Sequence, residues 1–425
     1  MRKITTLGEV ATYINGRAFK PSEWETSGIP IIRIQNLNDP TAKYNYSNTK
    51  YEDKYLVKKG DLLFSWSASL GAHIWKNSDA WLNQHIFRII PNENICKGYL
   101  YHFLCKVTAE LYAKSHGTGM VHITKKPFMA TPIPVPSLPE QERIVTRIEE
   151  LFSELDKAVE TLQTTKQQLA VYRQAVLKEA FEGKFTHEWR KHHSVNAAET
   201  VLQEITSSNR VVGFREMMEA CSLPDIPVTW KWISIGNIST GAEYGTSQKS
   251  LKDGKIPVIR MGNMQNGIID WSDLVYSSDE SEIKKYKLNK GDVLFNRTNS
   301  PEHVGKTSVY TGERVALFAG YIIRINHVPQ INSQYLTYYM NSSIARNYSN
   351  KVKTDGVNQS NINTQKLYSY PFPLCDIAEQ KQIVSALESR LSVCESIEQT
   401  VDTALAQADA MRQSILKQAF EEGYV

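Results

Sequence analysis

The chain has 425 residues, 41% of them hydrophobic and 22% charged, which excludes a generally disordered protein. The net charge of +4 indicates no particular partner, and the five widely spaced cysteines (Cys96, Cys105, Cys221, Cys375 and Cys394) contain no CxxC pair, so neither a disulfide scaffold nor a zinc ribbon is expected. No apolar run is long enough to span a membrane and no signal core begins the chain, so we expect a soluble, cytoplasmic protein.

Residues 1–138 are predicted to form a mixed α/β domain that is mostly β. Runs of β-branched and aromatic residues at 29–34, 61–66 and 85–90 indicate strands, because turn-forming residues separate them. A helix is predicted at 98–114. This segment holds 17 basic and 10 acidic side chains, a net of +7. Such an excess suits a polyanionic partner, but it is equally typical of a slightly basic globular domain.

Residues 139–183 are predicted to form one long helix. Apolar side chains recur at steps of three and four from Ile144 through Tyr172 to Val176, with one polar break at Thr165, which is the pattern of a coiled-coil seam. Residues 184–222 are predicted to be a linker. Its polar run at 186–193 contains three histidines without a cysteine or carboxylate at ligand spacing, so a solvated loop is expected rather than a metal site.

The second half of the chain repeats the first. The sequence Ile-Pro-Ile-Ile-Arg-Ile-Gln-Asn at 29–36 aligns with Ile-Pro-Val-Ile-Arg-Met-Gly-Asn at 256–263, and Lys-Gly-Asp-Leu-Leu-Phe at 59–64 aligns with Lys-Gly-Asp-Val-Leu-Phe at 290–295. Residues 223–376 are therefore predicted to be a second domain, with strands at 256–261, 292–296 and 320–325 and a helix at 333–348.

A second long helix is predicted at 377–425. It aligns with the first helix at a constant offset of 239 residues, and the seam recurs through Ile397 and Met411, with Arg390 as its one poor member. Because the two seams are narrow and equal in length, we expect the helices to pair as an antiparallel coiled coil. Two independent core helices are the alternative.

Catalytic signatures are missing from the sequence. It contains no GxxxxGK[ST], GxGxxG, HExxH or GxSxG run, and no Asn-Pro-Pro-Tyr or Asp-Pro-Pro-Tyr run of the kind that amino-methyltransferases use. We therefore expect no catalytic residue, no metal site and no cofactor in this chain. An enzyme with an unfamiliar site remains an alternative, for which activity of the purified chain would be the test.

Two pairs of loops point to nucleic-acid recognition. The loop at 64–69 corresponds to the loop at 295–300. The repeat keeps the apolar strand before each loop, but the polar residues of the loop differ. Two domains of one fold that recognise different DNA sequences would show this pattern. Ordinary drift between duplicated loops is the alternative. The loop at 115–126 and the loop at 355–363, together with Lys351 and Lys353 that precede it, contain glycine, basic residues and amides that suit bases and phosphates. The residues that end the first repeated strand are weaker candidates, because they can equally cap a turn.

The candidate DNA-binding residues of the first half are Arg33, Gln35, Asn36, Ser65, Trp66, Ser67, His116, Thr118, His122, Lys125 and Lys126. Those of the second half are Arg260, Asn263, Asn296, Arg297, Thr298, Asn299, Lys351, Lys353, Asn358, Gln359 and Asn361.

The chain resembles the specificity subunit (HsdS) of type I restriction–modification systems. The resemblance rests on the doubled strand motifs above, on the Ile-Pro-Val-Pro-Ser-Leu-Pro-Glu-Gln-Glu-Arg-Ile-Val run at the start of the first helix, and on the Arg-Gln-Ala-Val-Leu-Lys-Glu-Ala-Phe-Glu-Gly-Lys run that ends it. It covers essentially the whole chain. The first half lacks the Pro-x-x-Trp opening found at 227–230. The second helix starts Asp-Ile-Ala-Glu-Gln, where Asp376 is a candidate cap.

The resemblance implies an α+β fold, in which two mixed α/β, mostly β target recognition domains are separated by two long helices that form an antiparallel coiled coil, with an internal pseudo-twofold repeat. It implies that each domain reads one half of a split, asymmetric double-stranded DNA site. The helices are expected to set the spacer and to dock two methyltransferase subunits that carry S-adenosylmethionine. Two motor-nuclease subunits that use ATP and Mg²⁺ complete the expected complex. A stand-alone sequence-specific DNA-binding protein or coiled-coil scaffold is the alternative.

Overall fold

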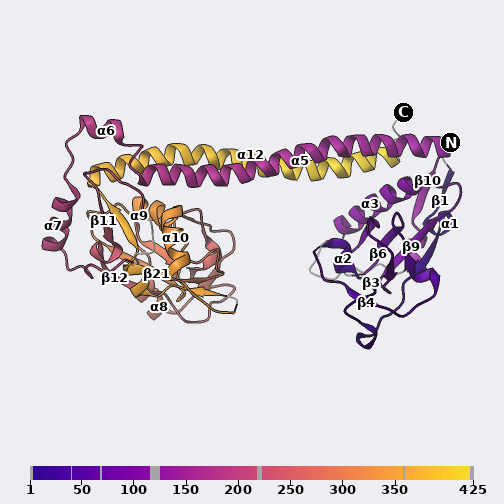
Figure 1. Cartoon of the computed structure of the whole chain (residues 1–425), viewed down its shortest axis with the longest axis horizontal. Coiled ribbons are helices and arrows are strands. Elements are labelled where there is room, and N and C mark those ends of the chain that lie inside the picture. The colour runs from indigo at the N-terminus through magenta and orange to yellow at the C-terminus, as the bar shows by residue number, and fades with distance from the viewer. Residues whose placement is uncertain are drawn as a thin grey trace. The chain divides into compact units, whose positions relative to one another are not determined.

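Figure 1 presents a computed structural model that describes residues 3–39, 41–67, 69–114, 125–217, 223–357 and 359–421. The chain divides into two compact units. The first consists of Met1–Thr164 with Val401–Val425, and the second of Thr165–Thr400. Each unit therefore contains one globular part and segments of both long helices, α5 (Leu138–Phe181) and α12 (Ile377–Glu421).

The first unit is built on two four-stranded sheets. One sheet has the antiparallel order β2 (Ala11–Asn15), β9 (Ile86–Pro91), β6 (Leu62–Ser65) and β7 (Gly71–Ile74). The other has the order β4 (Asn45–Ser47), β3 (Ile29–Ile32), β8 (Ala80–Leu82) and β5 (Leu56–Val57), with β3 and β8 parallel. β1 (Lys3–Thr6) pairs with β10 (Pro132–Val135), the strand that leads into α5. The helices are α1 (Leu7–Val10), α2 (Ile34–Asn38), α3 (Lys97–Lys114) and α4 (Lys125–Met129), with 3-10 turns at Pro21–Glu23 and Asp53–Tyr55.

The globular part of the second unit has the same plan. Its main sheet has the antiparallel order β12 (Ser239–Tyr244), β21 (Ile322–His327), β17 (Val293–Asn296) and β19 (Thr307–Val309). A second sheet has the order β16 (Val275–Ser277), β13 (Ile256–Ile259) and β20 (Leu317–Phe318), again with a parallel pair, and β11 (Lys231–Ser234) pairs with β24 (Pro371–Leu374) before α12. The remaining strands are the β14 (Met264–Gln265) and β15 (Ile268–Ile269) hairpin and the sheet β18 (Thr298–Asn299), β23 (Ser360–Asn361) and β22 (Thr354–Asp355).

One helix prediction for this unit is wrong. A single helix was expected at 333–348, but two helices, α9 (Ser333–Met340) and α10 (Ser343–Val352), occupy the region. The chain breaks between them at Asn341, whose side chain donates to the Thr307 carbonyl at 2.7 Å, and Ser342 then caps α10. The others are α6 (His187–His192), α7 (Ala198–Ser208), α8 (Glu280–Tyr286) and α11 (Thr364–Tyr368), with 3-10 turns at Ile235–Asn237 and Met261–Asn263.

The repeated Lys-Gly-Asp sequence forms the same turn in both units. Asp61 accepts a hydrogen bond from the Lys58 amide, and Asp292 accepts one from the Asn289 amide, each at 2.9 Å. The glycine before each aspartate has a φ of about 90°, which favours glycine over any other residue. Asp292 also lies 3.0 Å from the guanidinium of Arg324. The repeat therefore preserves a structural corner here.

The two long helices run antiparallel within each unit. In the second unit, Arg173 of α5 lies 3.2 Å from Glu398 of α12, while the chain just beyond the C-terminus of α5 reaches the N-terminus of α12, where Thr186 donates to Glu379 at 2.7 Å. In the first unit, Arg412 of α12 pairs with Asp156 of α5. The helix surfaces share the core of each globular part, and Figure 1 shows α3 beside the helix pair. The antiparallel pairing that the sequence predicted is thus confirmed.

Some predicted seam residues lie outside the helix interface. Tyr172 and Met411 are 50% and 55% exposed, and Ile397 is 40% exposed. Arg390, the poor member of the seam, is exposed, and Leu391 beside it is buried. The seam prediction is wrong at these positions. At two of them the buried residue is a neighbour along the helix, Arg173 beside Tyr172 and Leu391 beside Arg390.

The segment between the units' globular parts is more ordered than predicted. The run at 186–193 was expected to be a solvated loop, but it contains α6, and Thr186 is completely buried. Arg190 donates to the carbonyl of Gly183 at 2.7 Å and also pairs with the buried Glu379. Within the described residues, no cluster of three potential metal ligands is found, and no helix is both long and apolar enough to cross a membrane.

Candidate nucleic-acid interface

The tip after β6 in the first unit is a tight turn that displays an indole. Ser65 is completely buried and donates to the Ser69 carbonyl at 2.6 Å, which closes the turn. Ser67 is half-buried, and its carbonyl accepts from the Ser69 amide at 2.7 Å. Trp66 is half-buried and donates from Nε1 to Asn15 Oδ1 at 3.3 Å. Ser65 and Ser67 therefore shape the turn, and Trp66 is the side chain that it presents.

Trp66 belongs to an aromatic surface that also holds a lysine. Its ring stacks on Phe87 with centroids 5.9 Å apart, and it meets the His85 ring at 5.3 Å. The Lys125 ammonium lies 6.0 Å from the centroid of Phe87, and both Lys125 and Lys126 are exposed on α4. The structure thus brings together two residues, Trp66 and Lys125, that the sequence had placed in separate loops.

A cavity of about 460 Å³ continues this surface. Arg33 and Gln35 line it together with Trp24 and His85, so His85 contributes to both the cavity and the Trp66 surface. The Arg33 guanidinium lies 5.4 Å from the Trp24 ring, which holds the cation over an aromatic face. Aromatic, amide and guanidinium groups in one hollow suit the stacking and edge contacts that nucleobases offer.

In the second unit, the two predicted loops meet in one small sheet. Arg297 donates to Asn361 Oδ1 at 3.2 Å, and Asn361 donates to Thr298 Oγ1 at 2.9 Å. The Arg297 guanidinium also lies 4.8 Å from the centroid of the Tyr244 ring. Since β18 carries Thr298 and β23 carries Asn361, the pairing of these strands joins the tip after β17 to the loop after α10.

The other candidates in these two loops have diverse environments. Asn296 is completely buried, and neither Nδ2 nor Oδ1 of its side chain has a hydrogen-bond partner in the described part of the chain. Asn299 accepts from the Ser300 amide at 2.8 Å. Lys353 donates to the Pro301 carbonyl at 3.2 Å and lies 3.7 Å from Asp355. Lys351 and Gln359 are exposed.

The ends of the first repeated strands have a structural role. Asn36 accepts from the Arg33 amide at 3.1 Å and donates to the carbonyls of Ala42 and Lys43, both at 3.2 Å. Asn263, 2% exposed, accepts from the Arg260 amide at 2.9 Å and donates to the carbonyls of Asp270 and Asp273. The turn-capping interpretation therefore fits both asparagines, because the N–H donors of both amides are already used within the turn.

Arg260 is constrained as well, because it pairs with Asp273 at 2.8 Å. Four predicted residues, His116, Thr118, His122 and Asn358, lie outside the described residues.

The structure adds residues that the sequence did not single out. The Trp66 amide donates to the His85 carbonyl at 3.2 Å, and the Arg297 amide donates to the Tyr321 carbonyl at the same distance. His85 and Tyr321 are thus equivalent positions directly before β9 and β21, at an offset of 236 residues that aligns these strands. Burial raises the pKa of Tyr321 despite the opposing charge of Arg260. An alignment of the two repeats would have identified His85 and Tyr321 as equivalent positions with different residues. No feature of the sequence pointed to Trp24 or Tyr244.

Comparisons with known proteins agree with this picture. The family model described as type I restriction modification DNA specificity domain matches residues 3–169 and 227–407. The chain is 26% identical to the EcoBI specificity subunit of Escherichia coli, covering 98% of this chain and 84% of that protein. It is also 26% identical to the EcoKI specificity subunit of Escherichia coli strain K12, covering 98% and 88%.

The fold likewise matches a chain solved in a study of complex assembly and conformational transition of the type I R-M system. That chain is 18% identical, with a TM-score of 0.66 and coverage of 99% of this chain and 98% of the solved one. Two matched segments that together span most of the chain establish the relationship. The chain belongs to the type I restriction–modification DNA specificity family and is a DNA sequence-specificity subunit.

Proposed function

We propose that the two globular parts each read one half of a split, asymmetric double-stranded DNA site. One observation carries this proposal: equivalent positions on the same framework carry different side chains, Trp66 and His85 in the first unit but Arg297 and Tyr321 in the second. An indole offers stacking and one donor, whereas a guanidinium offers a bidentate fork that suits guanine. Two domains of the same fold that present different side chains at equivalent positions suit a DNA site whose two halves differ in sequence.

The long helices are proposed to dock two methyltransferase subunits and to set the spacer between the half-sites. Apolar side chains remain exposed on the helix segments of the second unit, including Val171 (71%), Tyr172 (50%) and Val393 (57%). Burial of such side chains against another protein would remove this apolar surface from water. Two motor-nuclease subunits are proposed to complete the complex, with S-adenosylmethionine, ATP and Mg²⁺ all carried by the partners.

The test is a genome-wide map of methylated adenines in the source cell with and without this gene. We expect deletion to abolish methylation at one split motif. Replacing residues 1–138 with the corresponding domain of another family member should then change one half of that motif and leave the other half and the spacer unchanged. A map that does not respond to deletion would favour a stand-alone DNA-binding protein, and a change in both halves would contradict separate readers.

A further inference from the structure

A small cavity of about 40 Å³ in the second unit lies where α9 and α10 meet the helix pair. Its lining includes three cations, Arg173, Lys306 and Arg346, and three amide side chains, Gln174, Asn266 and Asn341, but no carboxylate. A space of this size holds a few water-sized groups, enough for the anionic oxygens of a phosphate but too small for a base. The lining therefore favours an anion.

Two of the three cations lack an acidic partner. Arg173 is neutralised by Glu395 at 3.8 Å and Glu398 at 3.2 Å. Lys306 instead donates to the neutral Gln265 Oε1 at 3.0 Å, and in the part of the chain that the structure describes neither Lys306 nor Arg346 forms an ion pair. Burial, and next the charge of Arg346, lower the pKa of Lys306. Two like charges held together without a counter-charge are destabilising unless an anion binds between them.

The fold itself does not require this charge. Thr307 lies opposite Phe295 in the second unit, and Ala72 lies opposite Phe64 in the first, so the position of Lys306 corresponds to Gly71. The first unit builds the same hairpin without a cation. The lysine is thus an addition that the shared framework does not explain.

The cavity is also connected to the candidate base readers. The backbone amide of Asn296 donates to the Lys306 carbonyl at 2.8 Å, and Asn296 directly precedes Arg297. Lys306 and Arg297 therefore belong to the two sides of one hairpin. In protein–DNA complexes, phosphate contacts next to base contacts fix the register of the reader on the duplex.

We propose that Lys306 and Arg346 form a binding site for a backbone phosphate of the DNA half-site read by the second unit. Gln174 also lines the cavity, and its amide nitrogen, which makes a long hydrogen bond of 3.4 Å to the Asn341 carbonyl, is the group that can donate to a phosphate oxygen. The inference rests on the proposed function. It adds a contact that positions the DNA without reading its sequence.

The experiment measures binding of the full chain, in complex with its methyltransferase partners, to two duplexes at several KCl concentrations. One duplex carries the mapped site and the other a scrambled sequence. Arg346→Gln and Lys306→Gln should each weaken binding to both duplexes by a similar factor, roughly 5- to 10-fold, and reduce the slope of log K against log salt by about one. Lys284→Gln, which removes an exposed charge on α8 in the same unit, is the matched control and should change neither value.

Other results would overturn the inference. A loss confined to the mapped site would make these residues base readers. Unchanged DNA binding with weaker assembly would mean that the cavity binds a carboxylate of a partner protein. Failure of the proposed function is distinguishable, because it would appear as a methylation map that does not respond to deletion, whereas the scrambled duplex still reports on the phosphate contact.

Discussion

Gln141 and Gln380, 239 residues apart, make the same three hydrogen bonds. The Gln141 side chain accepts from the Cys96 amide at 2.8 Å and donates to the carbonyls of Asn94 and Pro136 at 3.0 and 2.9 Å. The Gln380 side chain accepts from the Asn332 amide at 2.9 Å and donates to the carbonyls of Gln330 and Cys375 at 3.1 and 2.9 Å. Each glutamine fixes the start of a long helix to the segment just before α3 or α9.

Replacing Gln380 with leucine should destabilise the second unit by about 3 kcal/mol, since one amide and two carbonyls lose their buried partner at roughly 1–3 kcal/mol each with partial relaxation. Equilibrium urea unfolding measures the loss. Gln382→Leu on the same helix is the control, because Gln382 is exposed, and it should change stability by no more than about 0.5 kcal/mol. Equal losses in both variants would show that the buried hydrogen bonds contribute little.

The repeat also predicts that two equivalent arginine substitutions destabilise the protein to different extents. Arg173 and Arg412 are equivalent residues, but the Arg173 side chain is 11% exposed and the Arg412 side chain 33%. Arg173→Met leaves Glu398, itself 25% exposed, without its partner and should cost about 1–2 kcal/mol, whereas Arg412→Met should cost less than about 1 kcal/mol. Urea unfolding of the two variants tests the order, and a larger loss for Arg412→Met would contradict it.

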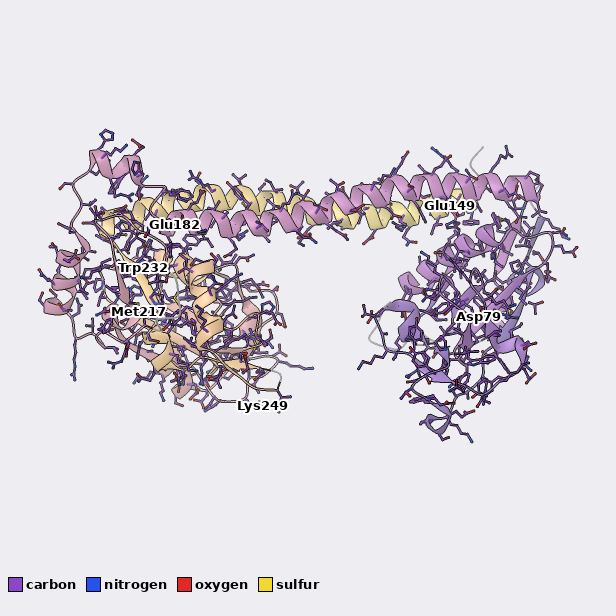
Figure 2. All side chains as sticks on the ribbon, in the orientation of Figure 1. Asp79, Glu149, Glu182, Met217, Trp232 and Lys249 are labelled. Atoms are coloured by element: carbon purple, nitrogen blue, oxygen red, sulfur yellow. The ribbon has the colours of Figure 1, made fainter. Side chains whose placement is uncertain are left out.

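His102 gives the first unit a stability that depends on pH. The side chain is 4% exposed, and burial lowers its pKa from 6.5 to about 4 although Nε2 lies 3.8 Å from Glu149 of α5, labelled in Figure 2. The unfolded chain takes up a proton as the pH falls below 6.5, but the folded chain resists until about 4. The free energy of unfolding is therefore at its full value, as far as His102 is concerned, above pH 6.5. It falls on acidification, by roughly 3 kcal/mol at pH 4.

The measurement is the difference in unfolding free energy between the wild-type protein and His102→Phe from pH 7.5 to pH 4. The phenylalanine variant should lose less stability over this range, since it has nothing to protonate. His187→Phe, at an exposed position, serves as the control and should follow the wild-type profile closely. Parallel profiles for wild type and His102→Phe would rule out the buried histidine as the cause.

The sequence predicted the framework well because repetition and hydrophobic periodicity survive in it. The strands at 29–34, 61–66 and 85–90 and their counterparts in the second half are found as expected, and Asp376 accepts from the Ala378 amide at 2.8 Å as the predicted cap. The break at Asn341 was missed because it depends on a hydrogen bond to Thr307, which is distant in sequence.

The candidate site was harder to predict for a related reason. Asn36 and Asn263 have the residue type of a base reader, and only the structure shows that their amides are used in the turn. Conversely, His85 and Tyr321 come next to the tips through strand pairing, which residue spacing alone does not reveal. Residue type indicates what a side chain can bind, but its partners in the fold decide whether it is free to do so.

Trp66→Ala and Arg297→Ala should each alter recognition of a different half of the DNA site. Arg297 is held by Asn361 and Tyr244 with its fork pre-organised, so its removal should reduce discrimination at one base pair of one half-site by about 1–3 kcal/mol. Arg297→Lys keeps the charge but not the fork, and it should lose most of the same discrimination. Methylation maps of cells carrying each variant report both halves at once. Restoration of the motif by lysine would mean that Arg297 acts only through its charge, and relaxation of both halves by one variant would refute the separation of the two readers.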